Sequence, residues 1–155
     1  GGGSADAAFT LKGLNELFEL EISSKKLEKY ALQLGADCPF FIDDRPALVE
    51  GIGEKLSHID LDLSVFEIRL VMPGIHISTA EAYAGVSPKI PKNPLRELIK
   101  LPIEKWKGKI KNDFERSIFI KHPKLQSIKE QLYKEGAIYA AMSGSGSTLY
   151  GFFVK

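Results

Sequence analysis

Cysteine is nearly absent from this sequence of 155 residues, in which Cys38 is the only one. A single thiol excludes an internal disulfide, and its position in an apolar stretch predicts an inert, buried side chain in a reducing compartment. Histidine is also scarce: His58, His76 and His122 show no metal-ligand spacing and have no cysteine pair to accompany them. A bound structural or catalytic zinc ion is therefore not expected.

An excess of charge of either sign is lacking as well, because 21 basic residues face 20 acidic ones. This balance argues against the basic footprint of a nucleic-acid-binding protein and against a polybasic membrane anchor. No apolar run approaches the length of a bilayer span, and no basic region followed by an apolar stretch opens the chain. We therefore expect a cytoplasmic protein whose partners are small molecules, with no nucleic acid and no membrane.

The composition is that of a folded protein, with 44% hydrophobic, 26% charged and 10% aromatic residues. The length suits one domain or two small lobes. The chain opens on three glycines without an initiator methionine, which we interpret as processing or truncation of a longer protein.

The first part of the chain has the pattern of two helices followed by short strands. Apolar spacing predicts a buried helix over residues 4–20 and a second helix over 24–34, which Gly35 ends. From Pro39 onward, short apolar runs separated by turn residues predict strands. These runs are 40–42, 47–49 and 65–72.

The second part alternates helices with loops and closes on a hairpin. Ser78 and Thr79 predict a helix start, and the proline-rich stretch 86–111 predicts a loop with one or two helical turns. One short helix is expected around Phe114, and another is expected to run from Pro123 to Gly136. Residues 137–154 then predict a hairpin whose turn is the glycine-serine segment 143–147.

The glycine-rich start is a candidate anion site. Gly1, Gly2, Gly3 and Ser4 place unobstructed backbone N–H groups at the positive end of the following helix. An engineered linker would also explain these four residues, but the small residues Ala5-Asp6-Ala7-Ala8 suit close packing that a linker does not need. The segment is not a Walker A loop, because no Gly-Lys-Ser or Gly-Lys-Thr ends it.

Three other segments are candidates for the same site. Asp37 lies in Leu-Gly-Ala-Asp-Cys-Pro-Phe-Phe, between a helix end and an expected strand, with Pro39 keeping the chain extended; a lone Asp there also suits an ordinary turn. Residues 143–148 read Ser-Gly-Ser-Gly-Ser-Thr, and their alternating glycines suit either an anion-binding row of N–H groups or a flexible hairpin turn. Thr79 lies in a helix start, which is itself a sufficient reason for a hydroxyl.

Taken together, these segments resemble the motifs of the GHMP kinase family. The resemblance implies an α+β fold with two lobes. Residues 1–60 would be the remainder of a ribosomal-protein-S5-like N-terminal domain, and residues 65–155 a ferredoxin-like C-terminal domain. The family motif begins some residues before Gly1, so the resemblance implies that an N-terminal region is missing.

The resemblance also implies roles for individual residues. Asp37 would be the catalytic base, Thr79 would lie near the substrate, and Asn112 to Glu115 would form a structural cap facing the site. ATP, accompanied by Mg²⁺, would bind at Gly1, Gly2, Gly3, Ser4, Gly144, Ser145, Gly146 and Ser147. The family's lysine near its N-terminus matches no residue here.

Within the family, the segments are most similar to the branch that phosphorylates the 2-hydroxyl of 4-diphosphocytidyl-2-C-methyl-D-erythritol in the non-mevalonate isoprenoid pathway. Kinases of mevalonate or homoserine type, and a non-catalytic nucleotide-binding remnant, remain the alternatives. We expect the isolated chain to be inactive. Loss of N-terminal strands would leave a sheet edge open for self-association.

Overall fold

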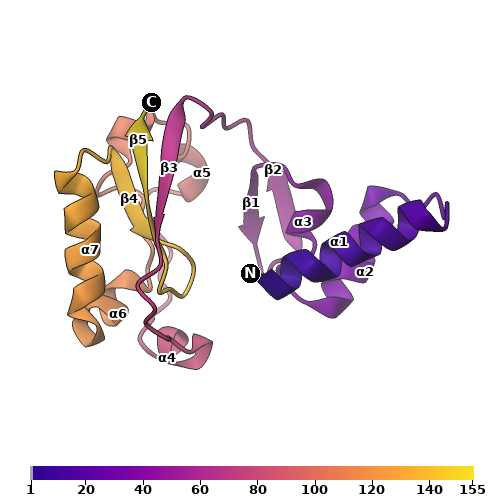
Figure 1. Cartoon of the computed structure of the whole chain (residues 1–155), viewed down its shortest axis with the longest axis horizontal. Coiled ribbons are helices and arrows are strands. Elements are labelled where there is room, and N and C mark those ends of the chain that lie inside the picture. The colour runs from indigo at the N-terminus through magenta and orange to yellow at the C-terminus, as the bar shows by residue number, and fades with distance from the viewer. Residues whose placement is uncertain (1) are drawn as a thin grey trace. The chain divides into compact units, whose positions relative to one another are not determined.

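The structure, a computed structural model of the chain, describes residues 2–155. It consists of two compact units, the first ending at Leu61 and the second running from Asp62 to Lys155. Each unit combines helices with an antiparallel sheet, as Figure 1 shows, and each has its own hydrophobic cluster. The α+β class expected from the sequence is therefore confirmed.

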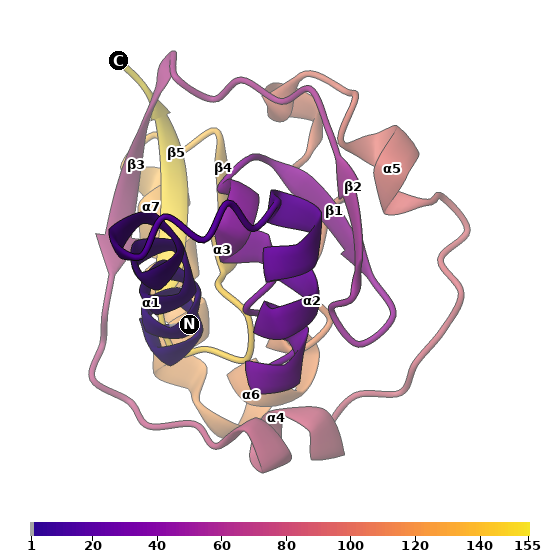
Figure 2. The same ribbon diagram turned by 90° about the vertical axis from the view of Figure 1, so that its right-hand side faces the viewer.

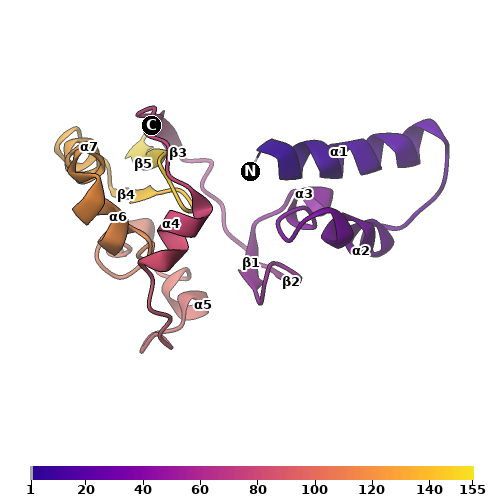
Figure 3. The same ribbon diagram turned by 90° about the horizontal axis from the view of Figure 1, so that it is seen from below.

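The first unit contains three helices and one hairpin. In Figure 3 the first two helices run side by side, joined by the loop at their far ends. The hairpin strands pair antiparallel, with Ala47 opposite His58. The elements are α1 (Gly2–Leu17), α2 (Ser24–Leu34), α3 (Phe40–Asp43), β1 (Ala47–Glu50) and β2 (Lys55–His58).

The core of this unit is small and lies where α1, α2 and α3 meet. It consists of Ala8, Leu27, Ala31, Cys38 and Ile42. Ala8 and Ala31 have no exposed surface, because alanine lets two helices approach closely. The expectation of a buried thiol at Cys38 is confirmed.

The expectation of a buried helix over residues 4–20 is wrong in two respects. The helix begins at Gly2, and Ala8 is its only fully buried member among the described residues. Phe9 is 52% exposed and Leu17 is 73% exposed. Apolar residues lie on several sides of α1, but α2 and α3 cover only the side that carries Ala8.

The strand expected at residues 40–42 is also wrong, because these residues form α3. Pro39 has φ −56° and ψ −34°, so it starts a helical turn instead of extending the chain. The Ile42 N–H then donates to the Pro39 carbonyl at 3.1 Å. Strand β2 was not predicted from the sequence; it pairs with β1 across Gly51 and Gly53, whose φ angles are 72° and 122°.

The second unit places helices against a three-stranded sheet in the order β3-β5-β4, with both pairs antiparallel. Figure 1 shows α7 lying along one side of this sheet, and Figure 2 shows the long extended connection between α4 and α5. The elements are β3 (Phe66–Val71), α4 (Thr79–Ala84), α5 (Leu95–Leu98), η1 (Ile103–Lys105), α6 (Glu115–Lys121), α7 (Pro123–Lys134), β4 (Tyr139–Met142) and β5 (Leu149–Val154). Every element expected in this half is present.

Both faces of the sheet carry apolar side chains. On one face, Leu125 and Leu132 of α7 belong to the same buried cluster as Met142, Leu149 and Phe153 of the sheet. On the other face lie the rings of Tyr139, Tyr150 and Phe152. Trp106 packs on that face, its ring centroid 5.6 Å from that of Tyr139. The second unit therefore has an independent core that can hold a loop in place.

No helix within residues 2–155 combines the length and the apolar character needed to cross a membrane. In the same range, no three histidine, cysteine or acidic side chains gather in a way that could hold a metal ion.

Candidate functional site

The glycine-rich start forms the first turn of α1. Gly1 lies outside the described residues, and Gly2, Gly3 and Ser4 are helical. N–H groups in the first turn of a helix have no acceptor within that helix, so they are available to an anion. A Cβ placed on Gly2 or Gly3 would meet no atom within 4 Å, which indicates open space around this turn.

Asp37 lies in the turn between α2 and α3 and is exposed. Its carboxylate makes no hydrogen bond or ion pair within the described part of the chain. The next residue, Cys38, belongs to the same buried cluster as Ala8 of α1 in the core of the first unit. This packing ties the Asp37 turn to the N-terminal half of α1, although 29 sequence positions (37 minus 8) separate Asp37 from Ala8.

A small hollow of about 250 Å³ lies beside Asp37. Its other lining residues are apolar or small: Ala36, Phe40, Phe41, Val49 and Gly53. Gly53 belongs here for a steric reason, since a Cβ at this position would lie 2.2 Å from the Ala36 carbonyl oxygen. The β1–β2 turn therefore packs directly on the backbone next to Asp37. Sequence reasoning missed this wall because it did not predict β2.

Residues 143–148 form a tight connection between β4 and β5. The Ser143 N–H donates to the Thr148 carbonyl at 2.8 Å, and the Gly146 N–H donates to the Ser143 carbonyl at 3.0 Å. Gly144 has φ 53° and Gly146 has φ 96°, a region of the backbone map that glycine enters at low cost. The segment is thus an ordered loop with a defined conformation.

The two glycines of this loop differ in their surroundings. A Cβ on Gly144 would meet no atom within 4 Å. A Cβ on Gly146 would lie 2.8 Å from Met142 Sδ and 3.0 Å from Ile77 Cδ1. The loop therefore packs on the segment that leads into α4.

Asn112 holds this loop from outside the hairpin. Its side-chain Nδ2 donates to the carbonyl oxygens of Met142 and Gly144, each at 2.7 Å. Its Oδ1 accepts from the Phe114 N–H at 2.9 Å, which fixes the amide at the entrance to α6. All three contacts use backbone partners, so the amide sets the position of the loop's first residues. The structural cap expected at residues 112–115 acts through these contacts.

Glu115 makes a second side-chain contact with Met142, the last residue of β4. Its Oε1 accepts from the Met142 N–H at 2.8 Å, and its Oε2 accepts from Lys129 Nζ at 2.5 Å. The side chains of Glu115 and Lys129 are only 11% and 22% exposed. This pair links α6, α7 and β4. Sequence spacing cannot reveal it, because the two residues lie 14 positions apart on separate helices.

Thr79 is the first residue of α4 and is exposed. The capping role belongs to Ser78, whose Oγ accepts from the Glu81 N–H at 3.1 Å. Ile77, two positions before Thr79, is the residue that packs near Gly146. The second unit therefore gathers the start of α4, the 143–148 loop and Asn112, while the first unit gathers the start of α1 with Asp37.

Comparison with known families supports this grouping. The family described as "GHMP kinases N terminal domain" matches residues 1–45, and the one described as "GHMP kinases C terminal" matches residues 95–155. The first match covers the start of α1 and Asp37. The second covers Asn112, Glu115 and the glycine-serine loop.

Individual relatives point the same way. A protein of Bacteroides fragilis named 4-diphosphocytidyl-2-C-methyl-D-erythritol kinase is 50% identical over 99% of this chain and 56% of its own length. Proteins of the same name are 48% identical in Cytophaga hutchinsonii and 41% identical in Chlorobium phaeobacteroides, covering 99% of this chain and 57% and 54% of their own lengths. The chain thus spans slightly more than half the length of the curated relatives it matches.

A solved structure is similar along nearly the whole chain. The crystal structure of 4-(cytidine 5'-diphospho)-2C-methyl-D-erythritol kinase matches with a TM-score of 0.77 and 31% identity, covering 97% of this chain and 55% of that one. Two matched domains and this structural similarity show that the chain belongs to the GHMP kinase family.

Proposed function

We propose that this chain carries part of the active site of an ATP-dependent kinase that phosphorylates the 2-hydroxyl of 4-diphosphocytidyl-2-C-methyl-D-erythritol, a step of non-mevalonate isoprenoid synthesis. The observation that carries the proposal is 50% identity over 99% of the chain to a protein named for that activity. Residues 1–60 would be the remainder of the N-terminal domain and residues 65–155 the C-terminal domain. Because the chain spans about 56% of that relative, the activity belongs to the whole enzyme.

In this proposal Asp37 is the general base. The carboxylate is exposed, is free of ion pairs among the described residues and lines a hollow with apolar walls. It would accept the proton of the substrate hydroxyl while the hydroxyl oxygen forms a bond to the γ-phosphorus of ATP and the bond to ADP breaks. Such transfer depends mainly on alignment and charge stabilisation, so a single carboxylate suffices.

The ATP phosphates would be bound by backbone N–H groups. One set would belong to Gly1–Ser4, and the other to Gly144–Ser147, in which the Gly146 N–H already donates to the Ser143 carbonyl and the other three N–H groups would serve. Mg²⁺ would arrive with ATP, held largely by phosphate oxygens, and would neutralise charge during transfer. Thr79 would face the substrate, close to the loop through the contact of Ile77 with Gly146.

A substrate panel tests this proposal. The full-length protein, given ATP and Mg²⁺, is expected to form ADP with the cytidyl compound and not with mevalonate or homoserine. ADP formation with mevalonate or homoserine alone would move the protein to another branch of the family. The non-catalytic alternative predicts that the 155-residue chain binds ATP weakly or not at all, which calorimetry with ATP on that chain measures. Tight binding with turnover would contradict this alternative.

A second copy of the chain is a further partner in this proposal. Loss of N-terminal strands would open a sheet edge in the first unit, where β1 and β2 pair only with each other among the described strands. Val49 on β1 is 44% exposed. Light scattering of the chain over a range of concentrations is expected to show association. A monomer that persists at high concentration would contradict it.

A further inference from the structure

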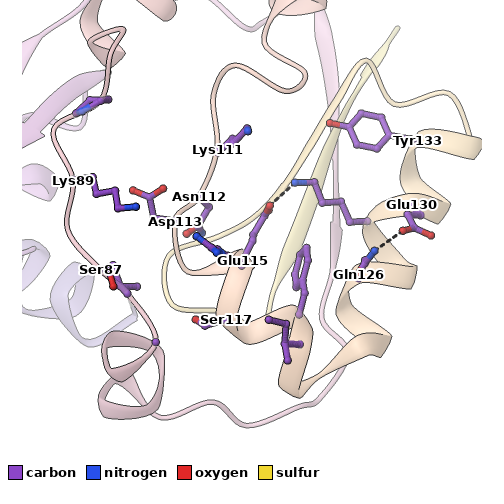
Figure 4. Close-up of a pocket in the computed structure, with 17 residues that line it drawn as sticks. Ser87, Lys89, Lys111, Asn112, Asp113, Glu115, Ser117, Gln126, Glu130 and Tyr133 are labelled. Carbon is purple, nitrogen blue, oxygen red and sulfur yellow. Dashed lines mark hydrogen bonds and ion pairs between the residues drawn. The ribbon is translucent and has the colours of Figure 1, made fainter.

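The second unit contains a large cavity in addition to the glycine-serine loop. Its volume is about 1040 Å³, at the upper end of the range of small-molecule sites. Three segments line it: the connection after α4, the residues from Lys111 through α6, and one face of α7. Figure 4 shows side chains entering from each of these segments, with Lys89 on the first, Asp113 on the second and Gln126 on the third.

Some of the charged side chains that line the cavity have a partner, and others do not. Four cationic side chains and three carboxylates line it, but Lys129 and Glu115 pair with each other. Glu130 accepts a hydrogen bond from Gln126 Nε2 at 2.9 Å. The other charged lining residues, Lys89, Lys111, Arg116 and Asp113, make no ion pair within residues 2–155.

Three cations without an ion pair line the cavity together with two carboxylates, Asp113 and Glu130, that have no cationic partner, so the wall keeps a small net positive charge. Lys89 lies on the connection after α4, Lys111 precedes α6 and Arg116 lies on α6. An anion bound in the cavity is attracted by these charges, and a cavity focuses this attraction more than a flat surface does. Arginine and lysine together suit phosphate, which accepts several hydrogen bonds at once.

The remaining lining groups indicate which other chemical groups the ligand carries besides phosphate. Asp113 offers an unpaired carboxylate that can accept a hydrogen bond from a hydroxyl or amino group. Apolar surface comes from Val86, Pro91, Phe119 and Ile120. A simple inorganic anion would use only the cations, whereas a phosphorylated organic molecule would use all three kinds of group.

We propose that this cavity is a binding site for a small phosphorylated organic molecule, with Lys89, Lys111 and Arg116 binding its phosphate. The site is separate from the phosphate-binding loop of the proposed kinase reaction. Its wall nevertheless includes Asn112, whose amide holds the carbonyl of Gly144. A molecule bound in the cavity therefore touches the residue that positions the loop.

Pyrophosphate titrated into the 155-residue chain tests the site, with backbone amide NMR shifts reporting where it binds. We expect shifts at residues lining the cavity, and binding weakened about tenfold by Lys111→Glu or Arg116→Glu. Lys134→Glu, at the end of α7 and outside the cavity, is the matched control and leaves binding unchanged.

Glucose 6-phosphate tests the organic part of the ligand, because it adds hydroxyl groups to a phosphate. It is expected to bind more tightly than pyrophosphate, and Asp113→Asn is expected to remove that difference in affinity.

Three results would overturn the proposal. Shifts confined to residues 143–148 would place pyrophosphate on the loop, which agrees with the proposed function but not with a second site. Equal weakening by Lys134→Glu would show non-specific attraction to surface charge. Full binding by a folded Lys111→Glu, Arg116→Glu double variant would show that these cations do not bind phosphate; if that variant does not fold, Lys89→Ala and Lys111→Ala give the same comparison.

Discussion

The side-chain amide of Asn112 lies 2.7 Å from the carbonyl oxygen of Gly144, although 32 positions separate the two residues in the sequence. The same nitrogen donates to the Met142 carbonyl, at the end of β4. The glycine-serine loop is therefore held by a side chain outside its own hairpin. In the proposed function this loop presents N–H groups to phosphate, and the Asn112 contacts would favour binding because preorganised donors need no rearrangement.

Replacing Asn112 by alanine is expected to lower the free energy of unfolding of the second unit by about 1–3 kcal/mol, because two carbonyls lose their donor. Trp106, the only tryptophan and buried in that unit, reports the transition by fluorescence in a urea titration. Asn93→Ala, in the exposed connection before α5, is the control and is expected to change stability by less than about 0.5 kcal/mol. Equal effects of the two variants would show that the Asn112 bonds carry no net stability.

The Glu115–Lys129 pair is expected to behave as a coupled unit. Lys129→Met leaves a largely buried carboxylate without its partner and is expected to cost about 3 kcal/mol in unfolding free energy. Glu115→Gln in the same protein should recover part of that loss. A double-mutant cycle followed by Trp106 fluorescence is expected to give a coupling energy above about 1 kcal/mol. Strict additivity would contradict the pairing.

The two loop glycines should respond differently to alanine. Gly144→Ala adds a Cβ into open space and is expected to cost about 1 kcal/mol, the cost of a left-handed backbone for a residue with a side chain. Gly146→Ala adds the same backbone cost and also drives a Cβ into Met142 and Ile77. We expect Gly146→Ala to lower the free energy of unfolding, measured in urea, by at least about 1 kcal/mol more than Gly144→Ala does. The reverse order would contradict the packing of Gly146 on Met142 and Ile77.

Asp43 makes the stability of the first unit depend on pH. The hydrogen bond from Arg45, with help from the charges of Arg45 and His58, lowers the pKa of the Asp43 carboxyl below its ordinary value of 3.8. A lowered folded pKa means that the stabilisation is present above 3.8 and is lost as the pH falls through the folded value. Because Arg45 is mostly exposed, the loss should stay below about 1 kcal/mol.

Asp43→Asn is the variant that isolates this effect. Its stability relative to the parent chain should be lower at about pH 6 and equal at about pH 2. Amide hydrogen exchange in α2 and β1 follows the first unit alone. A difference that does not change with pH would show that the Asp43 carboxyl is not stabilised by its charged neighbours.

The sequence allowed much of the second unit to be predicted, because its helices and strands show clear periodicity and are bounded by recognisable caps. Pro123 and Gly136, for example, bound α7 closely. The first unit was harder. Phe40 to Ile42 show the apolar run of a strand, and only the backbone angles of Pro39 turn them into α3. Short apolar runs do not distinguish the two structures.

Some residues of the candidate site could be identified from the sequence, and others could not. Asp37 and the glycine-serine loop could be proposed as site residues from the sequence because their short motifs resemble those of a known family. Three other features could not be predicted, since each joins residues far apart in the sequence. They are the contacts of Asn112, the Glu115–Lys129 pair and the packing of Gly53 against Ala36. Sequence periodicity reports which face of an element is apolar, whereas such polar contacts depend on how the elements pack.

The most direct test of the proposed function is the rate of ADP formation by the full-length protein carrying Asp37→Asn, with ATP, Mg²⁺ and 4-diphosphocytidyl-2-C-methyl-D-erythritol. Because Asp37 is exposed and makes no structural bond within residues 2–155, we expect the variant to fold normally and kcat to fall by at least about 100-fold. Asp44→Asn is the control, since Asp44 has φ 53° and asparagine tolerates that conformation, so its kcat should be unchanged. An Asp37→Asn enzyme with near-parental kcat would contradict the assignment of Asp37 as the base.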